Sequence, residues 1–188
     1  MRKIDNKGMT TIELLITFVI VVIIVVSMYA SVSNMKDKQT KESYKESLIT
    51  YKDLLTRDIQ SDLIMKQVID ANVVDDHTVD LTFKDGSNNR IVINKSSNNT
   101  LPKEVTPCSN PGSSTPDSIT YGGVDFPLPD IGSDNIEIGG TCKKVYSLTI
   151  GDVNISTDNG VFHLYVELTH PDLGNKYSIN IVCPIDYK

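Results

Sequence analysis

Glu13 is the residue whose position most strongly suggests a specific chemical role. It lies inside the longest apolar stretch of the sequence, between Ile12 and Leu14. A carboxylate at the centre of a bilayer costs about 2.5–3.5 kcal/mol, and less near the edge. A plain membrane anchor gains nothing from such a group. Glu13 could simply lie at the level of the lipid headgroups, but the residues around it favour a specialised role.

A basic segment precedes the apolar stretch. Residues 1–8 carry a net charge of +2, and residues 14–26 carry no charge. The apolar stretch reaches about 19 residues, and at about 1.5 Å per residue its helix nearly covers the ~30 Å hydrocarbon core of a bilayer. The basic flank predicts a cytoplasmic N-terminus and an extracytoplasmic remainder. A plain signal anchor fits this pattern, and so does a secretory signal that is cut after Ser33.

Residues 7–15, Lys-Gly-Met-Thr-Thr-Ile-Glu-Leu-Leu, support a third interpretation. This segment resembles the class III signal of type IV prepilins and pseudopilins. The resemblance implies that a prepilin peptidase cuts between Gly8 and Met9 and methylates the new amine of Met9. It also implies that Glu13 pairs with the N-terminal amine of a neighbouring subunit, which neutralises a charge inside an apolar bundle. Met9 stands where many members have Phe, and the helix lacks the proline that kinks many major pilins.

The same resemblance implies the partners and the location of the protein. The expected partners are other pilin subunits, the prepilin peptidase and N-methyltransferase, an inner-membrane assembly platform and, before assembly, membrane lipid. The expected location is the cytoplasmic membrane, crossed once with an extracytoplasmic C-terminal head, and the cell surface or pilus after assembly.

A single long helix is expected after the leader at residues 1–8. No Gly or Pro occurs between Met9 and Asp85, so nothing in that span punctuates a helix. We expect a hydrophobic membrane or filament-core helix over 9–33 that continues as an amphipathic helix over 34–74. A break near Ser31–Asn34 would instead give an anchor and a separate domain helix. Apolar residues at spacings of three and four place one face of the second half inward: Tyr44, Leu48, Tyr51, Leu55, Ile59 and Leu63.

The regular pattern of the helix, from about Thr10 to Ile69, gives way to strand patterns in the head, residues 75–188. Residues 78–83, 90–94, 144–150, 161–170 and 177–182 alternate or are rich in strand formers. Residues 102–140 hold six of the eight prolines and are expected to form an irregular surface loop. The fold class is therefore α+β, with a long N-terminal helix packed on an antiparallel sheet of four or five strands. The pilin-like resemblance implies the same fold.

The three cysteines would lie in the extracytoplasmic head, where disulfides can form. Cys142 precedes one predicted strand and Cys183 ends the last, so a Cys142–Cys183 disulfide is favoured because it would fasten the C-terminal edge. A Cys108–Cys142 disulfide that closes the long loop is the alternative. Type IV pilins often have a C-terminal disulfide, and the resemblance fits either pairing.

No cofactor is expected. Oxygen-bearing side chains alternate over residues 152–160, a spacing that calcium can use, but the EF-hand glycine and terminal glutamate are missing and Asp-Asn-Gly is common in hairpin turns. His77, His163 and His170 lack the spacing of a metal site, and His163 and His170 are expected on opposite faces of one strand. No catalytic motif occurs. A metal site or an enzymatic site is therefore not predicted.

Composition and motif together predict assembly rather than catalysis. The formal charge is −6, and removal of residues 1–8, which carry +2, takes it to −8, so no direct binding of nucleic acid is expected. The favoured function is a structural subunit of a type IV pilus, a competence pilus or a type II secretion pseudopilus, in particular a minor pilin or pseudopilin. The alternative is a single-pass anchored or secreted binding module with no role in a filament.

Overall fold

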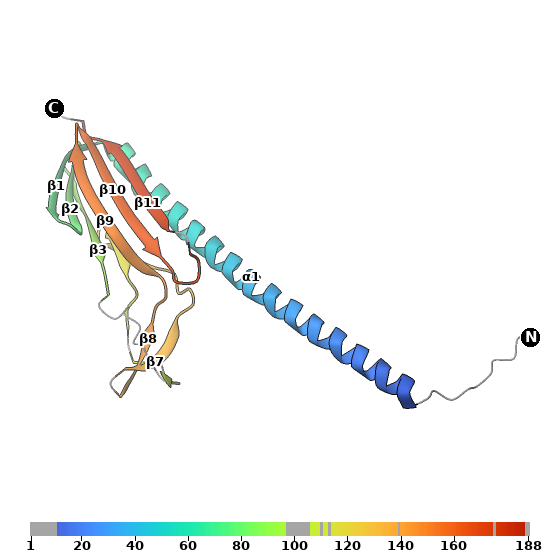
Figure 1. Cartoon of the computed structure of the whole chain (residues 1–188). Helices are drawn as coiled ribbons and strands as arrows, with labels where there is room; N and C mark the ends of the chain where they lie inside the picture. The colour runs from blue at the N-terminus through green and yellow to red at the C-terminus, as the bar shows by residue number, and fades with distance from the viewer. Residues whose placement is uncertain are drawn as a thin grey trace, which may run out of the picture. The chain divides into compact units, whose positions relative to one another are not determined.

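The computed structural model describes residues 11–96, 106–109, 111–112, 114–138, 140–174 and 176–186. They fall into two compact units, which divide between Glu42 and Ser43. Helix α1, Thr11–Lys66, is uninterrupted over its 56 residues (Figure 1). The prediction of one continuous helix is confirmed, and the break considered near Ser31–Asn34 does not occur.

Helix α1 ends earlier than the sequence suggested. Gln67 adopts a left-handed conformation, with φ of 55°, and strand β1 starts at Val68. The expectation that 34–74 is helical is therefore wrong for its last part. The segment Val68–Asp75 is rich in β-branched residues and pairs antiparallel with β2, so pairing decides its conformation.

The described residues form three antiparallel sheets, where the sequence suggested one sheet of four or five strands. The first has the order β1-β2-β3-β5-β6, with β1 Val68–Asp75, β2 Thr78–Phe83, β3 Asn88–Asn94, β5 Ser118–Tyr121 and β6 Val124–Pro127. The second has the order β11-β10-β9, with β9 Thr149–Asp158, β10 Val161–Thr169 and β11 Tyr177–Pro184. The third has the order β4-β7-β8, with β4 Thr106–Pro107, β7 Asp134–Ile138 and β8 Thr141–Val145.

The segment expected to be an irregular loop, 102–140, contributes strands to two of these sheets. Strands β5 and β6 extend the first sheet, and β4 and β7 belong to the third. Each has five residues or fewer and lies close to Gly or Pro, so the sequence contains no long alternation of apolar and polar residues that would predict it. These strands exist because distant segments pair with them, as Ile93 of β3 does with Ile119 of β5.

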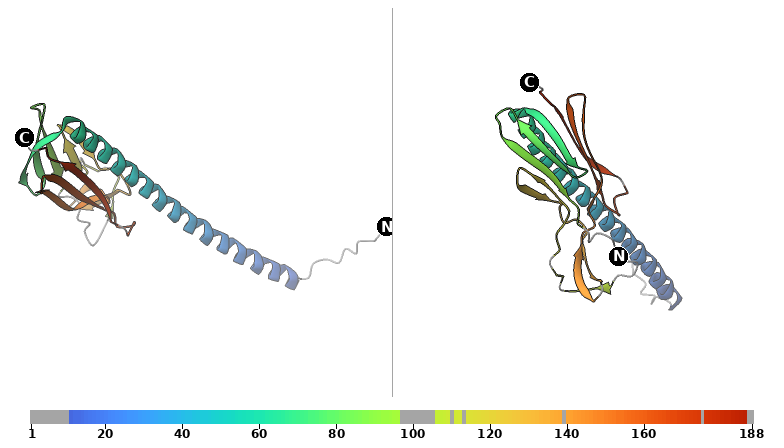
Figure 2. Two further views of the ribbon diagram at one scale, coloured as in Figure 1. Left: turned by 90° about the horizontal axis from the view of Figure 1, so that it is seen from above. Right: turned by 90° about the vertical axis from the view of Figure 1, so that its left-hand side faces the viewer.

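The core of the second unit, Ser43–Lys188, lies between α1 and the first two sheets (Figure 2). Four residues of α1 are at most 2% exposed, and each contributes on the order of 1.5–3 kcal/mol by burial: Leu48, Leu55, Ile59 and Leu63. Alternate residues of β2 and β10 meet them, as the sequence predicted: Val79, Leu81, Phe83, Phe162, Leu164, Val166 and Leu168. The prediction of an α+β fold with the helix packed on antiparallel sheet is confirmed.

Two tyrosines fix the position of α1 against the first sheet. The Tyr51 hydroxyl donates to the carbonyl oxygen of Phe126 at 2.8 Å. The Tyr121 hydroxyl donates to the carboxylate of Asp62 on the helix, which also pairs with Lys66 at 3.0 Å. These hydrogen bonds fix where α1 lies along the first sheet, because hydrophobic burial is non-directional and alone would let the helix slide.

Asp117 connects segments of the first sheet with the second sheet. Its side chain is 1% exposed, and its two carboxylate oxygens accept hydrogen bonds from the backbone N–H groups of Ser96 at 2.6 Å and Ile150 at 2.7 Å. Its carbonyl oxygen accepts from the N–H of Leu128 at 2.9 Å. Asp117 thereby joins the segment after β3, the segment after β6 and strand β9 at one point.

We predict that Asp117→Ala lowers the free energy of unfolding by about 3 kcal/mol, because the buried N–H of Ile150 and the part-buried N–H of Ser96 lose their acceptor. Urea denaturation of the full-length protein in detergent measures the loss. Asp76→Ala, at an exposed carboxylate, is the control and should change stability by less than about 0.5 kcal/mol. An equal effect of the two substitutions would contradict this role of Asp117.

We also predict a loss of stability at alkaline pH. Burial, with the nearby charge of Asp125, raises the pKa of Tyr51 above its ordinary value of about 10, and burial with the hydrogen bond to Asp62 does the same for Tyr121. The unfolded chain loses these protons near pH 10 while the folded chain keeps them, so the free energy of unfolding falls above about pH 10.

The measurement is a titration of phenolate absorbance alongside circular dichroism. Ionisation of Tyr51 and Tyr121 should coincide with unfolding, and the double variant Tyr51→Phe, Tyr121→Phe should lose this part of the pH dependence. Reversible ionisation of both phenols near pH 10 in the folded protein would contradict the prediction.

Candidate functional site: the apolar half of α1

The first half of α1 exposes apolar side chains on every side. Seventeen large apolar residues between Ile12 and Met35 are 43–79% exposed. Residues 14–35 contain no charge, and at 1.5 Å per residue they span about 33 Å. This helix is long and apolar enough to cross a membrane. A helix that is apolar all round is stable only in lipid or inside a larger protein assembly.

The hydroxyl groups of this half are satisfied within the helix. The Thr17 hydroxyl donates to the Glu13 carbonyl oxygen and the Ser27 hydroxyl to the Ile23 carbonyl oxygen, both at 2.8 Å. The Ser31 hydroxyl donates to the Ser27 carbonyl oxygen at 2.9 Å. Because each donor already has an acceptor four residues back, these groups can enter an apolar medium without losing a hydrogen bond to water.

Glu13 lies in the first turn of α1 and is exposed. A carboxylate is favourable there because the helix dipole places positive partial charge at the N-terminal end. The predicted cleavage and methylation residues Gly8 and Met9 lie outside the described residues. Among the predicted processing and assembly residues, Glu13 is therefore the one whose place in the helix is described.

The cysteine pairing favoured from the sequence is wrong. Cys108 and Cys142 form the disulfide, which was the alternative pairing, and Cys183 is a buried free thiol. Cys142 lies on β8 in the third sheet, and the N–H of Cys108 donates to the carbonyl oxygen of Asn135 on the neighbouring β7. The disulfide thus fastens the third sheet. Cys183 belongs to the inward face of β11, with Ile179 and Ile181.

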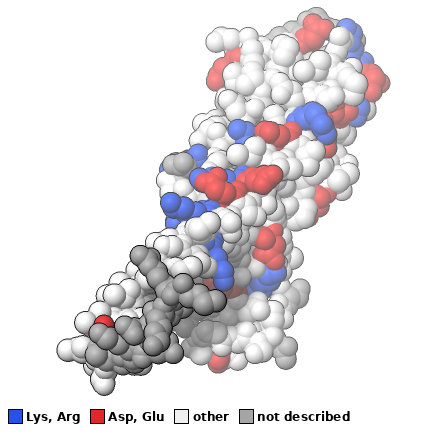
Figure 3. Space-filling view, turned by 90° about the vertical axis from the view of Figure 1, so that its right-hand side faces the viewer, with Lys and Arg blue, Asp and Glu red and all other residues white. Residues whose placement is uncertain are grey.

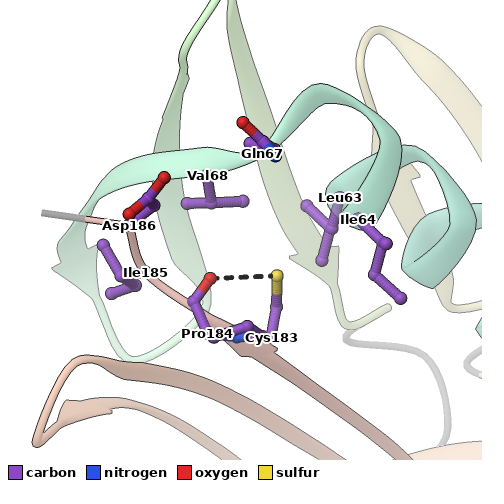
Figure 4. A pocket seen from close by; sticks show the side chains of 8 residues that line it. All are labelled: Leu63, Ile64, Gln67, Val68, Cys183, Pro184, Ile185 and Asp186. Atoms are coloured by element: carbon purple, nitrogen blue, oxygen red, sulfur yellow. Dashed lines mark hydrogen bonds between the residues drawn. The ribbon is translucent and has the colours of Figure 1, made fainter.

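The thiol of Cys183 lines a cavity of about 360 Å³ between the end of α1 and the end of β11 (Figure 4). Its Sγ donates to the carbonyl oxygen of Pro184 at 3.4 Å, and its exposed fraction is 2%. Burial raises the pKa of the thiol, which disfavours the reactive thiolate. Leu63 and Val68 line the same cavity. Cys183 therefore behaves as a small apolar core residue.

The other sequence candidates take structural positions. Residues 152–158 lie in β9, and Asn159 and Gly160, with φ of 52° and 77°, form the hairpin turn into β10. His170 is 5% exposed, with Nδ1 accepting from the N–H of Asp172 at 3.2 Å and its ring 5.4 Å from that of Tyr44. His170 therefore connects α1 to the turn after β10.

Two buried carboxylates were missed by reasoning from the sequence. Asp117 stands in a Pro- and Ser-rich segment that resembles a surface loop, so no sequence signal marks it. Glu167 stands at an outward position of β10 yet is 6% exposed. Lys176 covers it with an ion pair of 2.9 Å, and two residues of β9, Gly151 and Asp152, bulge opposite it.

Comparison with known proteins adds no relative. No family model matches the chain, and neither a curated protein nor a solved structure matches it. The long apolar N-terminal helix and the antiparallel sheet packed on its second half are compatible with a pilin-like fold.

The cysteine arrangement predicts a specific thiol titration. The folded, oxidised protein should show no rapidly reacting thiol, the unfolded oxidised protein one, and the unfolded reduced protein three. Peptide mapping should find Cys108 linked to Cys142. A Cys142–Cys183 peptide, or a thiol that reacts at once in the folded protein, would contradict this arrangement.

Proposed function

We propose that this chain is a filament subunit of the type IV pilin-like class, in particular a minor pilin or pseudopilin. The filament is a type IV pilus, a competence pilus or a type II secretion pseudopilus. The observation that carries the proposal is that one helix has two different surroundings. Its apolar half, which includes the charge-free residues 14–35, is exposed. One face of its second half packs into the core of the second unit.

The apolar half suits both stages of such a pathway. Before assembly it spans the cytoplasmic membrane, with the second unit outside. A peptidase removes residues 1–8, and the helix then moves from lipid into a bundle of identical helices. Both surroundings are apolar, so this transfer exposes none of the apolar surface to water. The satisfied hydroxyls of Thr17, Ser27 and Ser31 make the same helix acceptable in both.

Glu13 fixes the axial position of one subunit against its neighbour, which apolar packing alone does not fix. Side chains of similar shape can slide along each other, whereas a charge left unpaired inside an apolar bundle is strongly unfavourable, so the two charges must meet at one position. The proposed partner is the methylated amine of Met9 in the neighbouring subunit. The assembly therefore acts by positioned packing and one buried ion pair, with no catalytic step.

A single-pass anchored binding module is the second candidate. It is favoured by the same exposed apolar helix, since an anchor needs only length and hydropathy. The two candidates differ at Glu13, because an anchor has no use for that carboxylate whereas a filament subunit requires it.

The test is Glu13→Ala in the native host. Loss of one partner of a buried ion pair costs about 3–5 kcal/mol, so the proposal predicts that incorporation into sheared filaments falls by more than about 100-fold. Immunoblots of the filament and membrane fractions measure this. The amount in the membrane should stay unchanged, because removal of a carboxylate does not weaken the anchor.

Asp37→Ala is the matched control, since Asp37 is a carboxylate on the same helix beyond the charge-free residues. It should leave incorporation within about two-fold of the wild-type level. Normal incorporation of Glu13→Ala would overturn the filament proposal and favour the anchored module.

A further inference from the structure

The second sheet presents an unusual set of side chains on the face turned away from α1. Since Phe162, Leu164 and Val166 of β10 point into the core, His163 and Tyr165 point outward. Figure 1 shows this sheet, β9–β10–β11, in front of α1. We call the set Asn154, His163, Tyr165, Glu167 and Asn180 the β10 outer face.

Tyr165 lies at the centre of this face between two amides. Asn154 of β9 and Asn180 of β11 are its direct partners across the two neighbouring strands. Cross-strand partners have Cβ atoms about 4.5–5.5 Å apart, so both amides flank the ring. His163 and Glu167 stand two residues before and after it, about 7 Å along the strand in each direction.

These groups make no hydrogen bonds with one another. In the described part of the chain, the side chains of Asn154, His163, Tyr165 and Asn180 form no hydrogen bond, whereas the outer face of the first sheet is paired internally. There, Arg90 binds Asp80 through two hydrogen bonds, and Asn94 donates to Thr120, which donates to Asp125. Asn154, His163, Tyr165 and Asn180 therefore keep their donors and acceptors available to a ligand.

The charge of the face and its lack of an apolar centre argue against two kinds of ligand, a polyanion and a protein. Its carboxylates are Glu167, which is paired with Lys176, and the adjacent Asp152, and the Lys95 ammonium beside them already donates to the carbonyl oxygen of Gly151. A polyanion needs clustered Lys and Arg, which are missing here. Figure 3 likewise shows positive and negative residues interleaved on another side of the molecule. A protein partner needs a dry apolar centre, whereas the centre of this face is Tyr165 between two amides, and Val182, 38% exposed, lies opposite His163 on the outer strand β11.

We propose that the β10 outer face binds an uncharged glycan. The ring of Tyr165 offers a flat apolar surface for the C–H face of a sugar, and the two amides each offer a donor and an acceptor to vicinal hydroxyls on either side. Asn154, Tyr165 and Asn180 lie on three neighbouring strands, so their row is about 10 Å wide, which suits an oligosaccharide rather than one sugar.

The site is independent of filament assembly. None of its residues belongs to α1, and the binding can be measured on protein that has not assembled. Failure of this proposal would leave the filament proposal untouched, and the reverse also holds.

The experiment is a binding titration with full-length protein in a detergent whose headgroup is not a sugar. The probes are cellohexaose, maltohexaose and chitohexaose, with a heparin hexasaccharide as the anionic comparison. At least one neutral probe should bind with a dissociation constant below about 1 mM, and heparin should bind more weakly.

Four variants identify the site. Tyr165→Ala should weaken binding by about ten-fold or more, whereas Tyr165→Phe, which keeps the ring, should stay within about two-fold. Asn154→Ala and Asn180→Ala should each weaken it by about five-fold. Asn72→Ala, at an exposed amide on β1 of the first sheet, is the matched control and should have no effect. Equal melting temperatures show that each variant is folded.

Three results would overturn the proposal. They are a dissociation constant above about 1 mM for all three neutral probes, tighter binding of heparin than of any neutral probe, and neutral-probe binding that Tyr165→Ala leaves unchanged.

Discussion

The rest of the molecule depends on one constraint, which is that the apolar side chains of residues 14–35 of α1 must be kept out of water. A helix with no charge over about 33 Å, exposed on all sides, must lie in lipid or among other apolar helices. The second half of the same helix has no such freedom, because Leu48, Leu55, Ile59 and Leu63 form the core of a folded unit. One continuous helix therefore contributes both an exposed apolar segment and part of the core of a folded unit.

The second unit is held together by a few polar groups as well as by its core. Asp117 joins segments of two sheets, Tyr51 and Tyr121 fix α1 against the first, and Cys108–Cys142 fastens the third. Between β3 and β9 the chain leaves the first sheet for the third twice, at β4 and at β7, and returns to the first sheet once, at β5, so each departure needs a fastening point.

The parts of the fold that follow from local sequence pattern could be predicted. The span without Gly or Pro gave a continuous helix, spacings of three and four gave its buried face, and alternation gave the inward residues of β10. The end of α1 could not be predicted, because Val68–Asp75 becomes a strand only through pairing with β2. The short strands of 106–138 depend on distant partners in the same way.

The cysteine pairing and the buried carboxylates needed the tertiary structure. Cys142 precedes a regular segment and Cys183 ends one, yet they belong to different sheets, so position along the chain could not pair them correctly. Asp117 lies among residues typical of loops, and only the arrangement of three segments around it explains its burial. Glu13, in contrast, stands out in the sequence because a carboxylate in an apolar stretch is costly, and the structure places it in the first turn of α1.

The measurement that tests the central claim most directly is the intact mass and N-terminal sequence of the protein from the membranes of its native host. The account predicts a chain that starts at N-methylated Met9. A chain that starts at Met1 would contradict processing and leave a simple anchor, and a chain that starts after Ser33 would make the protein a secreted one.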